Sequence, residues 1–187
     1  MDFKLSKNEE QFLLKTAREI ITAKLEKRTL NLETPAGILL TNCGAFVTLH
    51  QKDKLGNRNL RGCIGNIIAR QSLFNTIKNM AQAAAFEDPR FSPMNRDDWP
   101  ACDIEISVLS PLEEINDPGV IKVGVHGIFI TRGFRSGVLL PQVATEQGWD
   151  LETFITHTCY KAGLPADAWK DSSTKIEIFS AQIFSEN

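Results

Sequence analysis

The sequence predicts an α+β protein, with a mainly antiparallel sheet and helices packed on one face. Strand-forming segments come in consecutive pairs separated by short polar turns, which is the pattern of hairpins. Helical periodicity appears in three separate segments and does not alternate one-for-one with strands, as a doubly wound parallel sheet would require. The 187 residues, 42% apolar and 24% charged, fit an ordinary globular protein, and we expect one domain over 1–187.

The first half of the chain is predicted to contain a helix, a hairpin and a second helix. Ser6 and Glu9 form a capping box ahead of apolar residues at helical spacing as far as Leu25. Residues 45–51 alternate between apolar and polar, and the polar turn 52–57 leads to a second strand over 59–64. From Ser72 onward, apolar residues recur at spacings of three and four, which predicts the second helix.

The second half is predicted to begin with an ordered loop over 88–93, where Phe91 is the expected anchor. Residues 102–109 alternate as a strand, with Asp103, Glu105 and Ser107 on its polar side. Segments 123–131 and 137–140 form a hairpin, Asp150 caps a helix that ends near Gly163, and 175–184 is a closing strand. We expect a smaller lobe over 118–163 and a larger one over 1–117 and 164–187.

Charge and cysteine usage narrow the class of protein. A formal net charge of −2 gives no overall attraction to nucleic acid or to anionic membranes. Residues 1–9 carry charge where a secretory signal needs an apolar run, and no segment reaches the length of a membrane span, so a cytoplasmic location is expected. The four cysteines are widely spaced, which favours reduced thiols over zinc sites or redox pairs, and no metal site is predicted.

The stretch Leu60-Arg61-Gly62-Cys63-Ile64-Gly65 is the main candidate site, since it places one thiol between two glycines and beside a cation. Glycines allow close approach of other groups, so the pattern indicates a cysteine held at a strand end near the start of the second helix. Arg61 and that helix N-terminus would favour the thiolate. The alternative is a buried structural cysteine, which is what most unpaired cysteines are.

Other residues are candidates for proton transfer or ligand binding. His126 precedes a glycine at a strand entry, and Glu105 lies on a polar strand face, so both are candidate catalytic groups beside Cys63. The candidate ligand-binding residues, suited to an anionic ligand, are Arg61, Gly62, Gly65, Arg90 and Arg135. The alternatives are a structural histidine, a solvated glutamate and ordinary surface arginines. His50 is expected to be exposed, and no motif indicates which cofactor, if any, is used.

The motif Leu60–Gly65 resembles the hallmark of the AMMECR family. Four further segments strengthen the resemblance: Asp88-Pro89-Arg90-Phe91, Val125-His126-Gly127, Leu139–Ala144 and Gln147-Gly148-Trp149-Asp150. The resemblance implies two α/β lobes with the cysteine motif near the cleft between them. It also implies that the chain corresponds to protein A of the AmmeMemoRadiSam system. The partners expected from the resemblance are a Memo-type protein and a radical S-adenosylmethionine protein. The family has no established reaction, so the resemblance carries no catalysis over to this chain.

Two classes of function therefore stay open. In the first, the chain is an enzyme or covalent carrier with a ligand-binding cleft around Leu60–Gly65, where Cys63 is the reacting thiol and His126 or Glu105 moves protons. In the second, it is a noncatalytic adaptor or binding module for a protein, a nucleic acid segment or a metabolite. The two differ in whether Cys63 is needed for binding.

Overall fold

The computed structural model describes residues 4–53 and 55–186, and these form two compact units. The first unit comprises the described residues up to Leu109 together with 182–186, and the second comprises Ser110–Ala181. Residues 1–3 of the charged amino terminus, Lys54 of the predicted turn, and the last residue lie outside the described residues. Each unit is described by itself below.

Two helices build one layer of the first unit. Helix α1 (Lys7–Glu26) begins at the predicted capping box, where Ser6 and Glu9 bond each other's backbone. Helix α2 (Leu73–Phe86) begins at Ser72, whose side chain accepts from the backbone N–H of Asn75. Both helices turn apolar residues toward the sheet, and these side chains form one core with those of the strands. The two predicted helices are confirmed.

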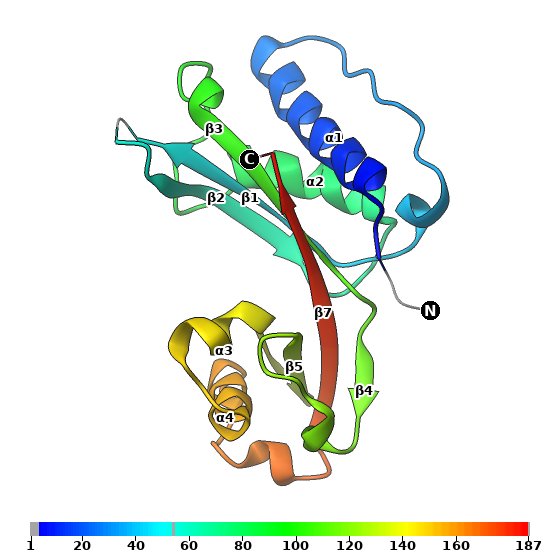
Figure 1. The fold of residues 1–187 in the computed structure, drawn as a ribbon, viewed down its shortest axis with the longest axis vertical. Coiled ribbons are helices and arrows are strands. Elements are labelled where there is room, and N and C mark those ends of the chain that lie inside the picture. Colours follow the sequence, from blue (N-terminus) through cyan, green and yellow to red (C-terminus); the bar gives the residue numbers. More distant parts are fainter. Residues whose placement is uncertain (1–3, 54, 187) are drawn as a thin grey trace. The chain divides into compact units, whose positions relative to one another are not determined.

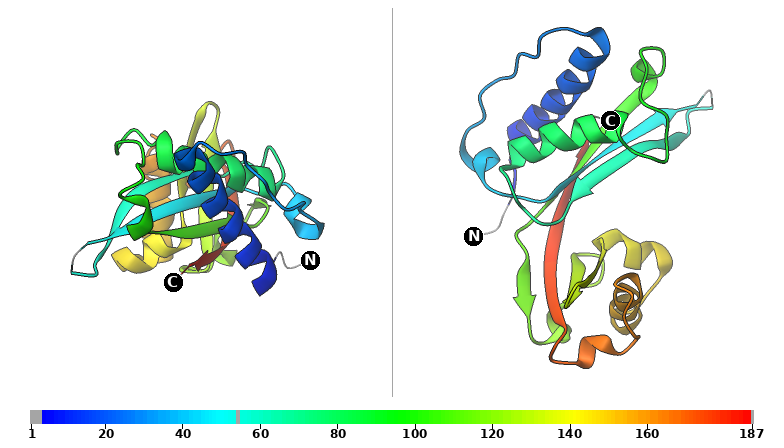
Figure 2. Two further views of the ribbon diagram at one scale, coloured as in Figure 1. Left: turned by 90° about the horizontal axis from the view of Figure 1, so that it is seen from above. Right: turned by 180° about the vertical axis from the view of Figure 1, so that it is seen from behind.

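The strands of the first unit are β1 (Ala45–Lys52), β2 (Arg58–Asn66) and β3 (Cys102–Leu109), in the order β2-β1-β3 and all antiparallel. The last residues of β7 (Lys175–Ser185) lie beside β3. Helices α1 and α2 cover the same face of this sheet (Figures 1 and 2). Val47 and Leu49 on β1 and Ile104 and Ile106 on β3 are fully buried against them. The opposite face of these strands carries polar side chains and forms the candidate site.

A β-bulge interrupts the pairing of β1 with β2. Leu49 pairs with Gly62 and His50 pairs with Leu60, so Arg61 is the extra residue on β2. A Cβ at Gly62 would lie 2.2 Å from the carbonyl oxygen of Ala84, so only glycine lets α2 pack this closely. The cysteine motif therefore lies within a strand that continues to Asn66, whereas the sequence placed it at a strand end.

The second unit contains β4 (Glu113–Ile115), β5 (His126–Arg132), β6 (Arg135–Leu139) and residues 175–181 of β7. These strands are antiparallel in the order β4-β7-β5-β6. Helices α3 (Pro141–Gln147) and α4 (Leu151–Lys161) pack on β5 and β6 around a separate core that includes Phe154. A Cβ at Gly137 of β6 would lie 2.4 Å from the backbone nitrogen of Ala162, which explains the glycine there.

The α+β class with an antiparallel sheet is confirmed, and several details differ from expectation. Helix α3 and strand β4 were missed, because seven and three residues are too few for a periodic pattern. Phe91 is only half-buried, and the buried residues that anchor its loop are Met94 and Trp99. Short 3-10 helices complete the structure at Gly37–Leu40, Trp99–Ala101, Pro118–Val120 and Ala168–Lys170.

The predicted smaller lobe, 118–163, falls inside the second unit, and its exact boundaries stay a prediction. Residues 113–115 and 175–181 also belong to that unit, because both segments pair with its strands. Among the described residues, no helix is long and apolar enough to cross a membrane.

Candidate functional site

The site lies on the face of β2-β1-β3 that α1 and α2 leave uncovered, which we call the helix-free face. Side chains alternate along each strand, so this face receives every second residue. The pairing of β2, β1 and β3 aligns the residues of this face in three rows that run across the strands. The rows are Gly65, Phe46 and Ser107; Cys63, Thr48 and Glu105; and Leu60, His50 and Asp103.

Cys63 occupies the middle row and is half-buried. The hydroxyl of Thr48, directly opposite on β1, donates to its Sγ atom over 3.2 Å. Glu105 lies on the other side of Thr48, on β3, and keeps a partly exposed side chain. The sulfur thus has a polar neighbour, and the residue that carries it is only half-buried.

The segment after α2 holds the backbone of Cys63. Its N–H donates to Oδ2 of Asp88 over 2.9 Å, and its carbonyl oxygen accepts from Nη2 of Arg90 over 3.1 Å. Arg90 also bonds Asp88, whose side chain is 1% exposed. The hydrogen bonds that Asp88 accepts hold its pKa well below its usual range, and the bond from the Arg90 side chain has the largest effect. Asp88 and Arg90 thereby fix the position of the cysteine main chain.

Arg61 lies apart from this thiol environment. The bulge turns it to the helix-covered side, where it is buried and its Nη2 lies 3.7 Å from Oδ2 of Asp98. Helix α2 passes the motif with its C-terminal half, at Ala84, while its N-terminus lies at Ser72. The expectation that a helix N-terminus and Arg61 favour the thiolate is therefore wrong. The cation that contacts Cys63 is Arg90, which donates to its carbonyl oxygen. The pKa of Arg90 is raised mainly by Asp88 and in part by Cys63.

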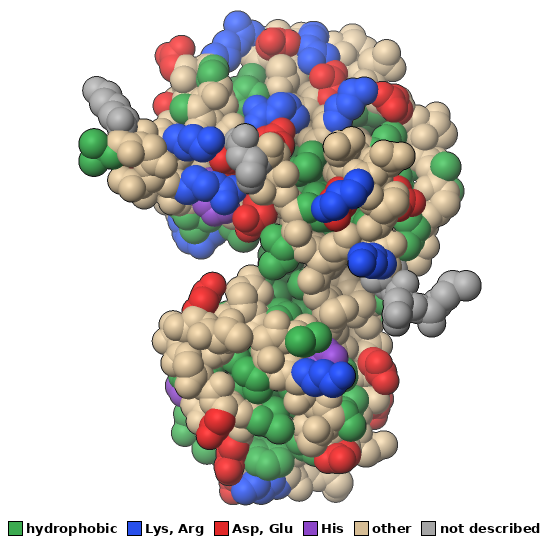
Figure 3. Space-filling view, viewed as in Figure 1, with side chains coloured by type: hydrophobic (Ala, Val, Ile, Leu, Met, Phe, Trp, Pro, Cys, Tyr) green, Lys and Arg blue, Asp and Glu red, His purple; other side chains and the backbone are tan. Residues whose placement is uncertain are grey.

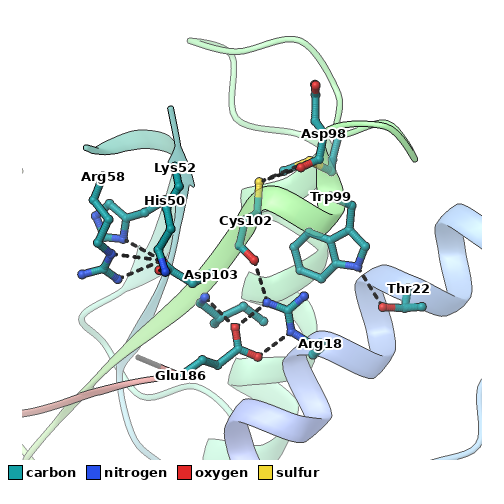
Figure 4. A network of polar contacts seen from close by, with 12 residues as sticks. Arg18, Thr22, His50, Lys52, Arg58, Asp98, Trp99, Cys102, Asp103 and Glu186 are labelled. Carbon is teal, nitrogen blue, oxygen red and sulfur yellow. Dashed lines mark hydrogen bonds and ion pairs between the residues drawn. The ribbon is translucent and has the colours of Figure 1, made fainter. Parts of the chain in front are cut away.

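A charged cluster adjoins Cys63 on the helix-free face. The buried carboxylate of Asp103 accepts from Nε and Nη2 of Arg58 over 3.1 and 2.9 Å, and Nζ of Lys52 lies 3.7 Å from it (Figure 4). Nη1 of Arg58 lies 3.7 Å from Glu105. Nδ1 of His50 lies 3.9 Å from Oδ1 of Asp103, and this nitrogen is buried without a hydrogen-bond partner among the described residues.

The prediction that His50 is exposed is wrong. Its side chain is 19% exposed, because it lies between the cluster residues of the two neighbouring strands. The sequence had placed His50 correctly on the polar face of β1, but it could not show that Arg58 and Asp103 cover that face.

The two glycines of the motif have separate steric roles. Gly62 admits α2, as described above. At Gly65, a Cβ would lie 2.2 Å from the ring of Phe46, so the ring packs over the bare backbone of β2. Both glycines thus allow close packing against the strand that carries the sulfur.

The remaining predicted site residues, His126 and Arg135, belong to the second unit. Nδ1 of His126 accepts from the backbone N–H of Lys122 over 3.3 Å, and the ring borders a cavity of about 530 Å³. Arg135 donates to the carbonyl oxygen of Gly163 over 2.7 Å. Their roles stay predictions.

Cys63 differs from the other cysteines. All four are unbridged, and Cys43, Cys102 and Cys159 are buried. Burial raises the pKa of Cys43 and of Cys102 to about 11, and it also raises that of Cys159. These three thiols are poor nucleophiles, so Cys63 is the one cysteine suited to reaction with a ligand.

The visible face of the first unit carries side chains of both charges. Lys and Arg side chains alternate with Asp and Glu over the first unit on the face shown in Figure 3. In the described part of the chain, no group of three or more His, Cys, Asp or Glu residues is arranged to hold a metal ion.

Sequence reasoning missed Thr48, Arg58 and Asp88 as parts of the site. The polar alternation of 48, 50 and 52 was a usable signal, since those positions share a face with Asp103 and Glu105 once the strands pair. The link from Asp88 to Cys63 spans 25 residues of sequence and only tertiary structure could show it.

The fold and site together define an α+β protein with one accessible thiol on a polar sheet face. Comparison with known proteins identifies the family. The AMMECR1 family model matches residues 14–184, and the chain belongs to this family.

Relatives cover almost the full chain. A protein of Methanothermobacter thermautotrophicus is 41% identical over 98% of this chain and 97% of its own length. Protein NEQ441 of Nanoarchaeum equitans is 41% identical over 94% of this chain and 99% of its own. The crystal structure of the uncharacterized protein PH0010 from Pyrococcus horikoshii matches with a TM-score of 0.82 and 38% identity, covering 99% of this chain and 95% of that one.

Proposed function

We propose that the helix-free face binds a small polar ligand and that Cys63 is the thiol that reacts with it. One observation carries the proposal: the half-buried sulfur receives a hydrogen bond from Thr48 and shares its face with a cluster of charged groups. The other three cysteines are buried, and burial raises the pKa of each, so Cys63 differs from them in being only half-buried.

The charges favour a ligand that carries both donors and acceptors. The cluster supplies the cations Arg58 and Lys52 beside the carboxylates of Asp103 and Glu105. Because opposite charges lie close together, no strong field selects for a polyanion such as nucleic acid. A metabolite or a peptide segment with mixed polar groups fits such a surface better.

The proposal extends to partners through the family. The chain would act beside a Memo-type protein and a radical S-adenosylmethionine protein, as one component of a three-protein system. Native mass measurement after co-expression of the three proteins tests this part. A complex with defined stoichiometry is expected, and three separate species would contradict it.

Limited alkylation separates the reacting thiol from a noncatalytic binding module. Iodoacetamide should modify Cys63 ahead of Cys43, Cys102 and Cys159, with mass mapping of peptides as the readout. Equal labelling of all four cysteines in the folded protein would contradict the proposal. If Cys63→Ser loses adduct formation but keeps partner binding, the site and the partner surface are distinct. If neither changes, the adaptor hypothesis stands instead.

A further inference from the structure

We infer that His50 accepts the thiol proton of Cys63 and that Asp103 positions the imidazole. This inference rests on the proposed function and deepens it, because it names the base that the sequence had sought in His126 or Glu105. All of the groups involved belong to the first unit.

Register makes His50 the nearest titratable neighbour on β1. Cys63 pairs with Thr48, and His50 follows Thr48 by two residues on the same face. Such diagonal neighbours on adjacent strands lie about 7–8 Å apart, within reach of a long side chain. Glu105 is two strands away from Cys63, roughly 10 Å at the spacing of sheet strands, and it is engaged near Arg58. Of the three histidines in the chain, His50 alone belongs to the first unit.

The surroundings of the imidazole match the role of a held base. Its Nδ1 faces the Asp103 carboxylate at 3.9 Å and has no hydrogen-bond partner among the described residues. A carboxylate at that nitrogen holds the ring in one tautomer and leaves Nε2 to exchange a proton, and such contacts are often long in the absence of ligand. Arg58 holds Asp103 in place through two hydrogen bonds (Figure 4).

Several other charged groups among the described residues lie around Cys63, His50 and Asp103. They are Lys52 on β1, Arg58 on β2, Glu105 on β3, and Asp88 with Arg90 after α2. Asp88 and Arg90 are bonded to each other and to the backbone of Cys63. Asp88 and Arg90 are therefore engaged in holding the backbone of Cys63. His50 is the group suited to take the proton.

The proposed step balances without another reactant. The proton leaves Sγ of Cys63 for Nε2 of His50, which gives a thiolate and an imidazolium. With iodoacetamide as the probe, the sulfur then forms a bond to the methylene carbon, the carbon–iodine bond breaks, and iodide leaves. The imidazolium later releases its proton to solvent.

The test measures the rate of Cys63 alkylation by iodoacetamide between about pH 5.5 and 7.5, where imidazoles titrate. The proteins compared are wild type, His50→Gln, His157→Gln of the second unit as the matched control, and Asp103→Asn. The inference predicts that His50→Gln slows labelling about tenfold near neutral pH, an energy of about 1.4 kcal/mol. His157→Gln should stay close to wild type. Asp103→Asn should change the shape of the pH profile, which loss of packing alone would not do.

A second readout protects the test against misfolding of a variant. Imidazole resonances followed by NMR should show that Cys63→Ser alters the titration of His50 and leaves that of His157 unchanged. Equal alkylation profiles for wild type and His50→Gln, together with an unchanged His50 titration, would overturn the inference. If Cys63 reacts quickly in both proteins, the proposed function survives that result. If Cys63 is unreactive in wild type, the proposed function itself fails.

Discussion

At the scale of single residues, the environment of one sulfur atom depends on a hydroxyl, and this can be tested directly. Thr48→Val keeps the shape of the side chain and removes the 3.2 Å hydrogen bond to Cys63. A neutral hydrogen bond contributes about 0.5–1.5 kcal/mol. We therefore expect the alkylation rate of Cys63 to fall several-fold, while the thermal midpoint changes little. Thr131→Val, on β5 of the second unit, is the control and should leave the rate unchanged.

Asp88 gives a second prediction at this scale, one that depends on pH. Its folded-state pKa is lowered, mainly by Arg90, so it stabilises the folded protein above the pKa of an unfolded aspartate, about 4. That stabilisation is lost as the pH falls toward the folded value. Asp88→Asn should cost about 2–3 kcal/mol at neutral pH, since it removes charge-assisted hydrogen bonds. Urea unfolding at neutral pH and near pH 3 checks this, and an equal difference at both would contradict it.

At the scale of elements, the contact between α2 and β2 depends on a residue without a side chain. Gly62→Ala places a Cβ against the Ala84 carbonyl oxygen, and neither backbone can move away without disturbing the core. We expect a loss of about 3 kcal/mol in the free energy of unfolding. Gly133→Ala is the matched control, because nothing lies within 4 Å of its Cβ position and only its φ of 59° opposes the change. It should cost about 1–2 kcal/mol.

The same scale shows what could be predicted from sequence. The capping box at Ser6, the alternation of 102–109 and the cap at Asp150 are local signals, and each led to an element that the structure contains. The bulge at Arg61 is not a local signal. It arises because β2 has one more residue than β1 can pair, and that count depends on register. The sequence alone consequently could not show that Arg61 lies on the helix-covered side, near Asp98.

At the scale of the whole molecule, each unit has its own core, and the proposed site draws its groups from the first. We therefore predict that His126→Gln leaves the alkylation rate of Cys63 unchanged. The histidine belongs to the second unit, where it bonds the backbone of Lys122. A slowing comparable to that expected for His50→Gln would show instead that the second unit takes part.

The site was foreseen in part. The motif led to Cys63 because glycines beside a thiol are a local pattern, and the polar face of 103–107 led to Glu105. Thr48 and His50 come from β1 and Asp88 from the segment after α2, and only the pairing of the strands and the path of the chain after α2 bring them to the thiol. A sequence pattern shows which face of its own strand a residue occupies. It does not show which residues of a neighbouring strand lie beside it.

If the fold activates Cys63, this thiol must react faster in the folded protein than in the unfolded chain. The iodoacetamide rate constant of Cys63 is measured at neutral pH in the folded protein and again in the protein unfolded by urea. Partial burial alone would make the folded rate lower. We predict a folded rate several-fold higher, because hydrogen bonding and a nearby base favour the thiolate. A folded rate equal to or below the unfolded one would contradict it.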